Sequence, residues 1–137
     1  MLQRNYDKVK ASEVLINNSI GRGLGYTDGA GSKVTQATNR ATGVTINSLT
    51  GQITTHNASL AAEASAEFIV TNSKVKLNDV VVLSIQSGAI GVGTMATVST
   101  VTNGSFTIRI HNGNVAAGTA ETGAIILNFA VIKGASV

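Results

Sequence analysis

The chain has 137 residues and no cysteine, which is enough for one domain and excludes disulfides, thiolate metal sites and a cysteine nucleophile. Charged residues make up only 12% of it, about half the usual share for a soluble domain. Aromatic residues make up 4%, too few for the stacking platforms that bind single-stranded nucleic acids or sugars. These proportions favour flat, neutral surfaces that pack against copies of the chain or against another protein.

Residues 1–24 come first in chain order, and their composition differs from the rest. They contain four of the ten basic residues, which are Arg4, Lys8, Lys10 and Arg22. Four dispersed cations in a chain with a formal charge of +3 do not predict a nucleic-acid partner. We expect an N-terminal arm or an added edge strand with a glycine-rich junction, followed by a single domain over residues 25–137.

No signal for a membrane or for secretion is predicted. The opening stretch MLQRNYDKVKASEV carries charges where a secretory signal has its apolar region. The longest apolar run, AIILNFAVI, has the length of a strand and is far shorter than the ~18 residues of a membrane span.

The stretch GRGLGYTDGAGSK, residues 21–33, invites comparison with phosphate-binding loops. A Walker A loop requires lysine directly after the second glycine and Ser or Thr after the lysine. Here Ser32 separates Gly31 from Lys33, and Val34 follows the lysine. A dinucleotide fingerprint fails as well, because Tyr26 stands where its last glycine belongs. We therefore interpret the run as a turning linker whose glycines supply positive φ angles.

Strand signals dominate the remainder of the chain. β-Branched and alternating segments recur about every ten residues, at 33–37, 43–47, 51–56, 66–72, 79–85, 94–101, 105–110 and 124–132. This spacing predicts an all-β antiparallel sandwich, or a jelly-roll-like fold, of about eight strands. The segment 79–85 is apolar on both faces, as in a central strand or an interface strand. Residues 57–68 are rich in alanine, which allows either a short helix capped by Asn57 or a loop into the next strand.

Two segments have the clearest side-chain pattern. In residues 66–70, Ala66, Phe68 and Val70 share one face. The sequence VTNGSF predicts a hairpin that joins 94–101 to 105–110, with Asn-Gly in a type I′ turn. In its second strand, apolar residues alternate with polar ones, so that Phe106, Ile108 and Ile110 oppose Thr107, Arg109 and His111.

Catalytic and metal-binding patterns are weak. His56 and His111 lie far apart, and neither has a second ligand at metal-site spacing. Asp28 has no neighbouring acids of a calcium loop. Glu63 and Glu67 would align on a helix, but such a pair is more often a solvated face than a glycosidase pair. We therefore expect no enzyme activity, no cofactor and no metal, and we assign no catalytic residue.

From Gly25 onward the chain resembles a family of small head-associated virion proteins of tailed bacteriophages. The resemblance is carried by residues 25–73, by DVVVLSIQSGA (79–89), by GSFTIRIHN (104–112) and by AIILNFAVIK (124–133). The block VTQAT…TGVT…GQIT within 25–73 is distinctive but carries no catalytic chemistry. Residues 1–24 lie outside the matching pattern.

The resemblance implies a capsid decoration, or cement, protein that stabilises the expanded shell by bridging capsid subunits. The implied partners are further copies of the chain, as a homotrimer, and the major capsid protein, with no nucleic acid and no membrane. The implied location is the outer surface of the virion head, after synthesis in the host cytoplasm. The arm then supplies candidate capsid contacts, which are Arg4, Tyr6, Lys8, Lys10, Leu15 and Ile16. A head-fibre base, a tail component and a host-surface binding module remain as alternatives.

Overall fold

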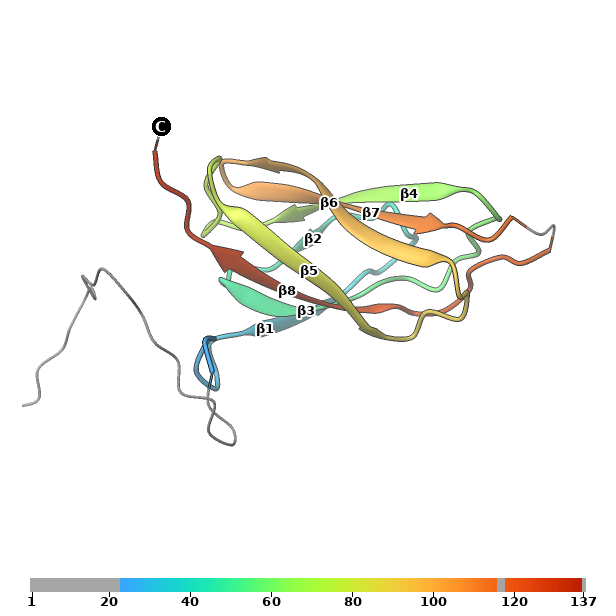
Figure 1. Ribbon diagram of the computed structural model, residues 1–137, viewed down its shortest axis with the longest axis horizontal. Helices are drawn as coiled ribbons and strands as arrows, with labels where there is room; N and C mark the ends of the chain where they lie inside the picture. Colours follow the sequence, from blue (N-terminus) through green and yellow to red (C-terminus); the bar gives the residue numbers. More distant parts are fainter. Residues whose placement is uncertain (1–22, 116–117, 137) are drawn as a thin grey trace, which may run out of the picture.

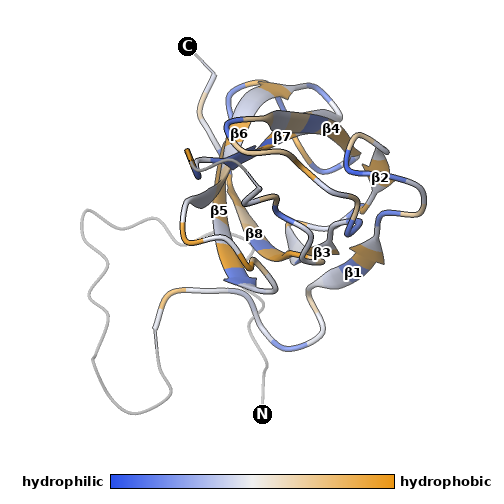
Figure 2. Cartoon of the chain, turned by 90° about the vertical axis from the view of Figure 1, so that its right-hand side faces the viewer, coloured by the Kyte–Doolittle hydropathy of each residue, from blue (hydrophilic) through white to orange (hydrophobic). Residues whose placement is uncertain are grey.

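The computed structural model describes residues 23–115 and 118–136, which form eight strands and no helix. The strands pack as two layers, and Figure 2 shows these layers separately because it looks along the sandwich from one end. In chain order they are β1 (Ser32–Thr35), β2 (Val44–Thr45), β3 (Thr50–Thr54), β4 (Ser65–Thr71), β5 (Val80–Ser87), β6 (Thr94–Thr102), β7 (Ser105–Asn112) and β8 (Ile126–Ile132). The predicted all-β sandwich is therefore confirmed. Within the described ranges there is no helix long and apolar enough to cross a membrane.

Each layer contains four strands, and Figure 1 labels each of them. Sheet A has the order β1-β3-β8-β5, and sheet B has the order β2-β4-β7-β6. The pairs β1–β3 and β2–β4 are parallel, whereas the other four pairs are antiparallel. The sandwich is thus antiparallel through its centre and parallel at the edge where β1 and β2 lie.

The core lies between the sheets and follows the alternation of the sequence. Phe68 and Val70 on β4 and Phe106, Ile108 and Ile110 on β7 are buried, as predicted. On sheet A, the inward side chains of β8 are buried in the same way. Phe106 and Phe129 join the two layers, with ring centroids 5.4 Å apart and planes tilted by 53°, a favourable arrangement for two aromatic rings.

The position of β5 settles one of the two alternatives for the doubly apolar segment 79–85. The strand lies at the edge of sheet A, beside β8, so the alternative of a central strand is wrong. Its inward residues Val81, Leu83 and Ile85 pack against the core but stay only partly buried. Its outward residues Val80 and Val82 are exposed, so its second apolar face is directed toward solvent.

Residues 57–64 form the predicted loop rather than the alternative short helix. Leu60 makes an antiparallel bridge to Glu121, with N–O distances of 3.0 and 2.9 Å. Glu63 has φ of 60°, which a helix does not allow. The pairing with a distant segment satisfies backbone groups that a helix would have satisfied locally, and Leu60 is buried as a result.

The hairpin between β6 and β7 is confirmed, but its predicted type I′ turn is wrong. Thr102 pairs with Ser105, and of the two turn residues only Gly104 has positive φ, at 85°. A type I′ turn requires positive φ at both. Contacts with the segment before β5 fix the observed conformation, since the Leu77 N–H donates to Asn103 Oδ1 at 3.1 Å and the Gly104 N–H donates to the Val75 carbonyl at 3.0 Å.

Truncation of one core isoleucine tests this packing. Ile108 on β7 has no solvent exposure, whereas Ile69 on the neighbouring β4 is 56% exposed. We expect Ile108→Ala to lower the free energy of unfolding by about 2–5 kcal/mol, because it leaves a cavity. The matched control Ile69→Ala should cost less than about 1 kcal/mol. Urea unfolding of both variants measures the difference, and equal losses would contradict the assigned core.

Candidate interaction surface

The outward face of sheet A carries an apolar patch on β5 and β8. Register places Val80 opposite Ile132 and Val82 opposite Ala130. Val80, Val82 and Ile132 are 57%, 50% and 58% exposed, although valine and isoleucine usually lie inside. We call these four residues the apolar patch. Contiguous exposed aliphatic side chains of this kind mark protein contact surfaces more often than scattered ones do.

Neutral amide side chains continue the same face beyond the patch. Gln52 on β3 donates to Gln86 Oε1 at 2.5 Å and to Asn128 Oδ1 at 3.2 Å. A hollow of about 520 Å³ lies over this region and is lined by Lys33, Val82 and neighbouring residues of all four strands. The face is therefore hollowed, uncharged over β3, β5 and β8, and able to accept a side chain of a partner.

The outward face of sheet B has a different character. Arg109 Nε lies 2.8 Å from Glu67 Oε1 in a solvent-exposed ion pair. His111 Nδ1 lies 3.0 Å from Ser65 Oγ, so His111 stands on the polar face as predicted. A partner covering this face would have to remove a charged pair from water, which costs free energy. Sheet A consequently offers the face whose burial costs less.

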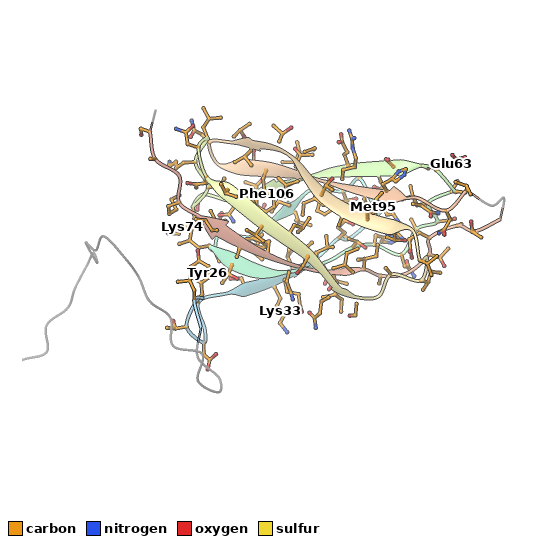
Figure 3. The ribbon with its side chains drawn as sticks, viewed as in Figure 1. Tyr26, Lys33, Glu63, Lys74, Met95 and Phe106 are labelled. Atoms are coloured by element: carbon orange, nitrogen blue, oxygen red, sulfur yellow. The ribbon has the colours of Figure 1, made fainter. Side chains whose placement is uncertain are left out.

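The glycine-rich run enters sheet A directly. Gly29 has φ of 81° in a turn closed by a 3.1 Å hydrogen bond from the Ala30 N–H to the Thr27 carbonyl. Two residues after Gly31, Lys33 lies within β1 and pairs with Gln52. Figure 3 shows its side chain projecting away from the sandwich. The interpretation of the run as a turning linker is confirmed at Gly29, whereas Gly23, Gly25 and Gly31 do not have positive φ.

The predicted capsid contacts Arg4, Tyr6, Lys8, Lys10, Leu15 and Ile16 all lie outside the described residues. The other candidates from the sequence are not brought together. His56 Nδ1 accepts a 3.0 Å hydrogen bond from the Ala58 N–H. Over residues 23–115 and 118–136, no group of three His, Cys, Asp or Glu side chains is positioned to hold a metal ion.

A buried carboxylate holds the end of the sandwich where β5 crosses to β6. Glu121 has no solvent exposure. It accepts hydrogen bonds from the backbone N–H groups of Ile90 at 3.1 Å, Gly91 at 3.0 Å and Gly123 at 2.7 Å, and from Thr94 Oγ1 at 2.5 Å. Because β5 belongs to sheet A and β6 to sheet B, this one side chain fixes the connection between the two layers.

A buried guanidinium lies beside this carboxylate. Arg40, 3% exposed, donates to the carbonyls of Ala58 at 2.5 Å, Glu121 at 3.1 Å and Gly123 at 2.9 Å. Its Nη1 also donates to Thr55 Oγ1 at 3.3 Å. Burial lowers the pKa of Arg40, and the charge of Glu121 offsets only part of that effect. Arg40 thereby ties the loop before β4 to the segment that leads into β8.

Hydrogen bonds decide the charge of Glu121. Burial alone raises the pKa of this carboxyl, because the charged form loses water. Donation from Thr94 and from three backbone N–H groups outweighs that effect, so the pKa of Glu121 lies below its usual value. The side chain therefore remains a carboxylate inside the protein at neutral pH.

Asp79 repeats this arrangement just before β5, near the apolar patch. It is 6% exposed and accepts hydrogen bonds from the backbone N–H groups of Lys76 at 2.8 Å and Gly134 at 3.1 Å, and from Lys133 Nζ. Burial again raises the pKa of Asp79, but the contacts with Lys133 and with the two N–H groups lower it by more than burial raises it. The pKa of Asp79 therefore lies below its usual value. The end of β8 is thus tied to the start of β5.

The sequence did not indicate Arg40 and Glu121 as structural centres. A single charged residue in a polar segment is ordinarily solvated, and nothing in NRAT or TAETG distinguishes these two. The sequence carried only an indirect signal for burial of these two residues. In a chain with so few charges, a lone charged residue between neutral segments has few oppositely charged partners on the surface.

Comparison with known proteins adds no relative, since no family model, curated protein or solved structure matches the chain. The composition of the two outward sheet faces is therefore the structural basis for inferring what the chain binds.

Replacement of the buried carboxylate by its amide tests the role of Glu121. In Glu121→Gln, one acceptor oxygen becomes an NH₂ group that faces N–H donors, so we expect a loss of about 1–3 kcal/mol at neutral pH. The matched control Glu67→Gln, in the exposed ion pair with Arg109, should cost about 0–1 kcal/mol. Urea unfolding measures both, and an equal or smaller loss for Glu121→Gln would contradict the assigned role.

The difference in unfolding free energy between the wild type and Glu121→Gln should depend on pH. Because the folded pKa of Glu121 is lowered, its contribution is complete above the unfolded pKa of about 4.3 and is lost as the pH falls through the folded pKa. The stability advantage of the wild type over Glu121→Gln should therefore shrink below about pH 4. An advantage that stays constant through the acid range would mean that the carboxylate charge contributes nothing.

Proposed function

We propose that this chain is a non-enzymatic structural protein of a tailed-bacteriophage virion, a decoration protein that binds the outer head surface and bridges capsid subunits. The sequence resemblance supplies the class of protein. The observation that carries the proposal is the apolar patch, which adjoins a neutral amide face on one side of a well-packed sandwich. A binding surface of this composition requires another protein surface rather than a small polar ligand.

Energetics favour such a contact. Burying the apolar patch removes aliphatic surface from water at about 25 cal/mol per Å², without the cost of desolvating a charge. Stable protein interfaces bury about 1,600 Å² in total, more than the patch alone provides, so the surrounding amide face must take part. On a shell, many such contacts act together, and their combined strength exceeds that of any single one.

Self-association and the arm complete the proposal. The copies form a homo-oligomer, a trimer on the resemblance, and the major capsid protein is the second partner. Residues Arg4, Tyr6, Lys8, Lys10, Leu15 and Ile16 of the arm adapt the domain to its own capsid. The protein accordingly resides on the virion head.

A charge placed in the apolar patch tests its role. Val82→Lys puts an ammonium group in the centre of the proposed contact, so we expect binding to expanded, undecorated heads to weaken at least about tenfold, or about 1.4 kcal/mol. Thr97→Lys places the same charge on an exposed position of β6 in the other sheet and should bind normally. Co-sedimentation with heads measures both variants. Equal binding of the two would contradict the proposed surface.

Deletion of residues 1–20 tests the arm. The described sandwich begins after this segment, so we expect the truncated protein to fold and to remain oligomeric while losing attachment to heads. Analytical ultracentrifugation and head co-sedimentation separate the two properties. Unchanged attachment would show that the sandwich alone makes the contact.

A further inference from the structure

The β5 edge of sheet A is open along its whole length. Only β8 lies beside β5 in the sheet order, so alternate backbone N–H and C=O groups of β5 have no neighbouring strand within the described residues. The strand spans eight residues and contains no charge and no proline. Charges, prolines and short length are the usual protections of an edge strand, and β5 has none of them.

The core beneath this edge is incompletely covered. Val81, Leu83 and Ile85 face inward from β5 but are only partly buried. The inward residues of the adjacent β8 are fully buried by comparison. An additional strand alongside β5 would therefore pair free backbone groups and also cover apolar side chains of the core.

The other open edges offer less to an added strand. β1 has four residues, including Lys33, and β2 has two. β6 is long, but its register shifts between Val98 and Thr100 in the middle of the strand, and such a bulge twists an edge away from pairing. In β5 the shift lies between Ile85 and Ser87, which leaves the stretch from Val80 to Ile85 regular.

The chain enters the sandwich at the end where β5 begins. The Tyr26 hydroxyl donates to the carbonyl of Val131 on β8, and Val131 pairs with Val81 on β5. Figures 1 and 3 show Tyr26, the end of β8 and the start of β5 at the same end of the molecule. Tyr26 is thus anchored next to the sheet whose edge is open.

Length and direction both suit a return along β5. Crossing from the β3 side of β8 to the free side of β5 spans three strand spacings, about 14 Å. Five residues, 21–25, can span about 17 Å, and three of them are glycine. A strand that ends at this corner runs toward the start of β5, so it would lie antiparallel to β5.

We propose that residues 13–20 of the same chain, EVLINNSI, add to the β5 edge as a fifth, antiparallel strand of sheet A. Val14, Ile16 and Ile20 occupy three of the four even positions, with Asn18 at the fourth, close to the period of a strand with one buried face. Pairing Asn17 with Ser84 places Val14, Ile16, Asn18 and Ile20 over Val81 and its inward neighbours, while Leu15, Asn17 and Ser19 face outward. In this arrangement Leu15 stays available as a capsid contact, whereas Ile16 becomes a core residue instead. The eight residues match the length of β5. The strand widens the sheet A face, and the basic residues before it leave from the far end of β5.

Chemical cross-linking between introduced cysteines tests the placement. Because the chain has no cysteine of its own, only the introduced pair can react. Asn17→Cys with Ser84→Cys on β5, treated with a short bis-maleimide, should give a cross-link within one chain. The control pair, Asn17→Cys with Thr35→Cys on the opposite edge strand β1, should give at least tenfold less. Cross-links between chains, or equal yields for the two pairs, would overturn the proposal.

Amide hydrogen exchange provides a second readout. In the full chain, the β5 amides that do not donate to β8 should exchange at least tenfold more slowly than in the chain lacking residues 1–20, with β1 amides unchanged. Identical β5 exchange in the two proteins would overturn the proposal. Neither experiment involves heads, so a negative result would overturn the added strand without bearing on the proposed capsid binding. A failure to bind heads would likewise not bear on the added strand.

Discussion

The fold depends on one charged side chain that has no contact with water. Glu121 must find its hydrogen bonds inside the protein, and it takes them from the β5–β6 connection and from the segment before β8. Those segments are two of the places where the chain passes between the two sheets. Removing one partner of a buried charge costs much more than a neutral hydrogen bond contributes. Glu121, with Arg40 beside it, thus ties two of the connections between the sheets to each other at one end of the sandwich.

This internal use of charge shapes the surface as well. The chain has few charged residues, and Arg40, Asp79 and Glu121 are buried. The outward face of sheet A over β3, β5 and β8 has amides, hydroxyls and exposed aliphatic side chains, with Lys33 on β1 at its border. Sheet B has the ion pair of Glu67 and Arg109. The asymmetry between two faces of one small domain is the physical basis for assigning the contact to sheet A.

The strands could be predicted from the sequence because their alternation is local. Phe68 on β4 and Ile108 on β7 follow a period of two that burial alone imposes. The edge position of β5 could not be predicted, since a doubly apolar segment fits a central strand equally well and pairing is decided by distant residues. The conformation of Asn103 depends on the Leu77 backbone, and the burial of Glu121 depends on donors about thirty residues away. Long-range contacts of this kind leave no local pattern.

The most direct test of the account is a reconstruction of the virion by electron cryo-microscopy. The account predicts density for this chain over the outer shell of the head, with the β5–β8 side of sheet A against the capsid and the Glu67–Arg109 face toward solvent. Density arranged around the tail axis would contradict the proposed role. Density on the shell with the sheet B face against the capsid would contradict the assigned surface.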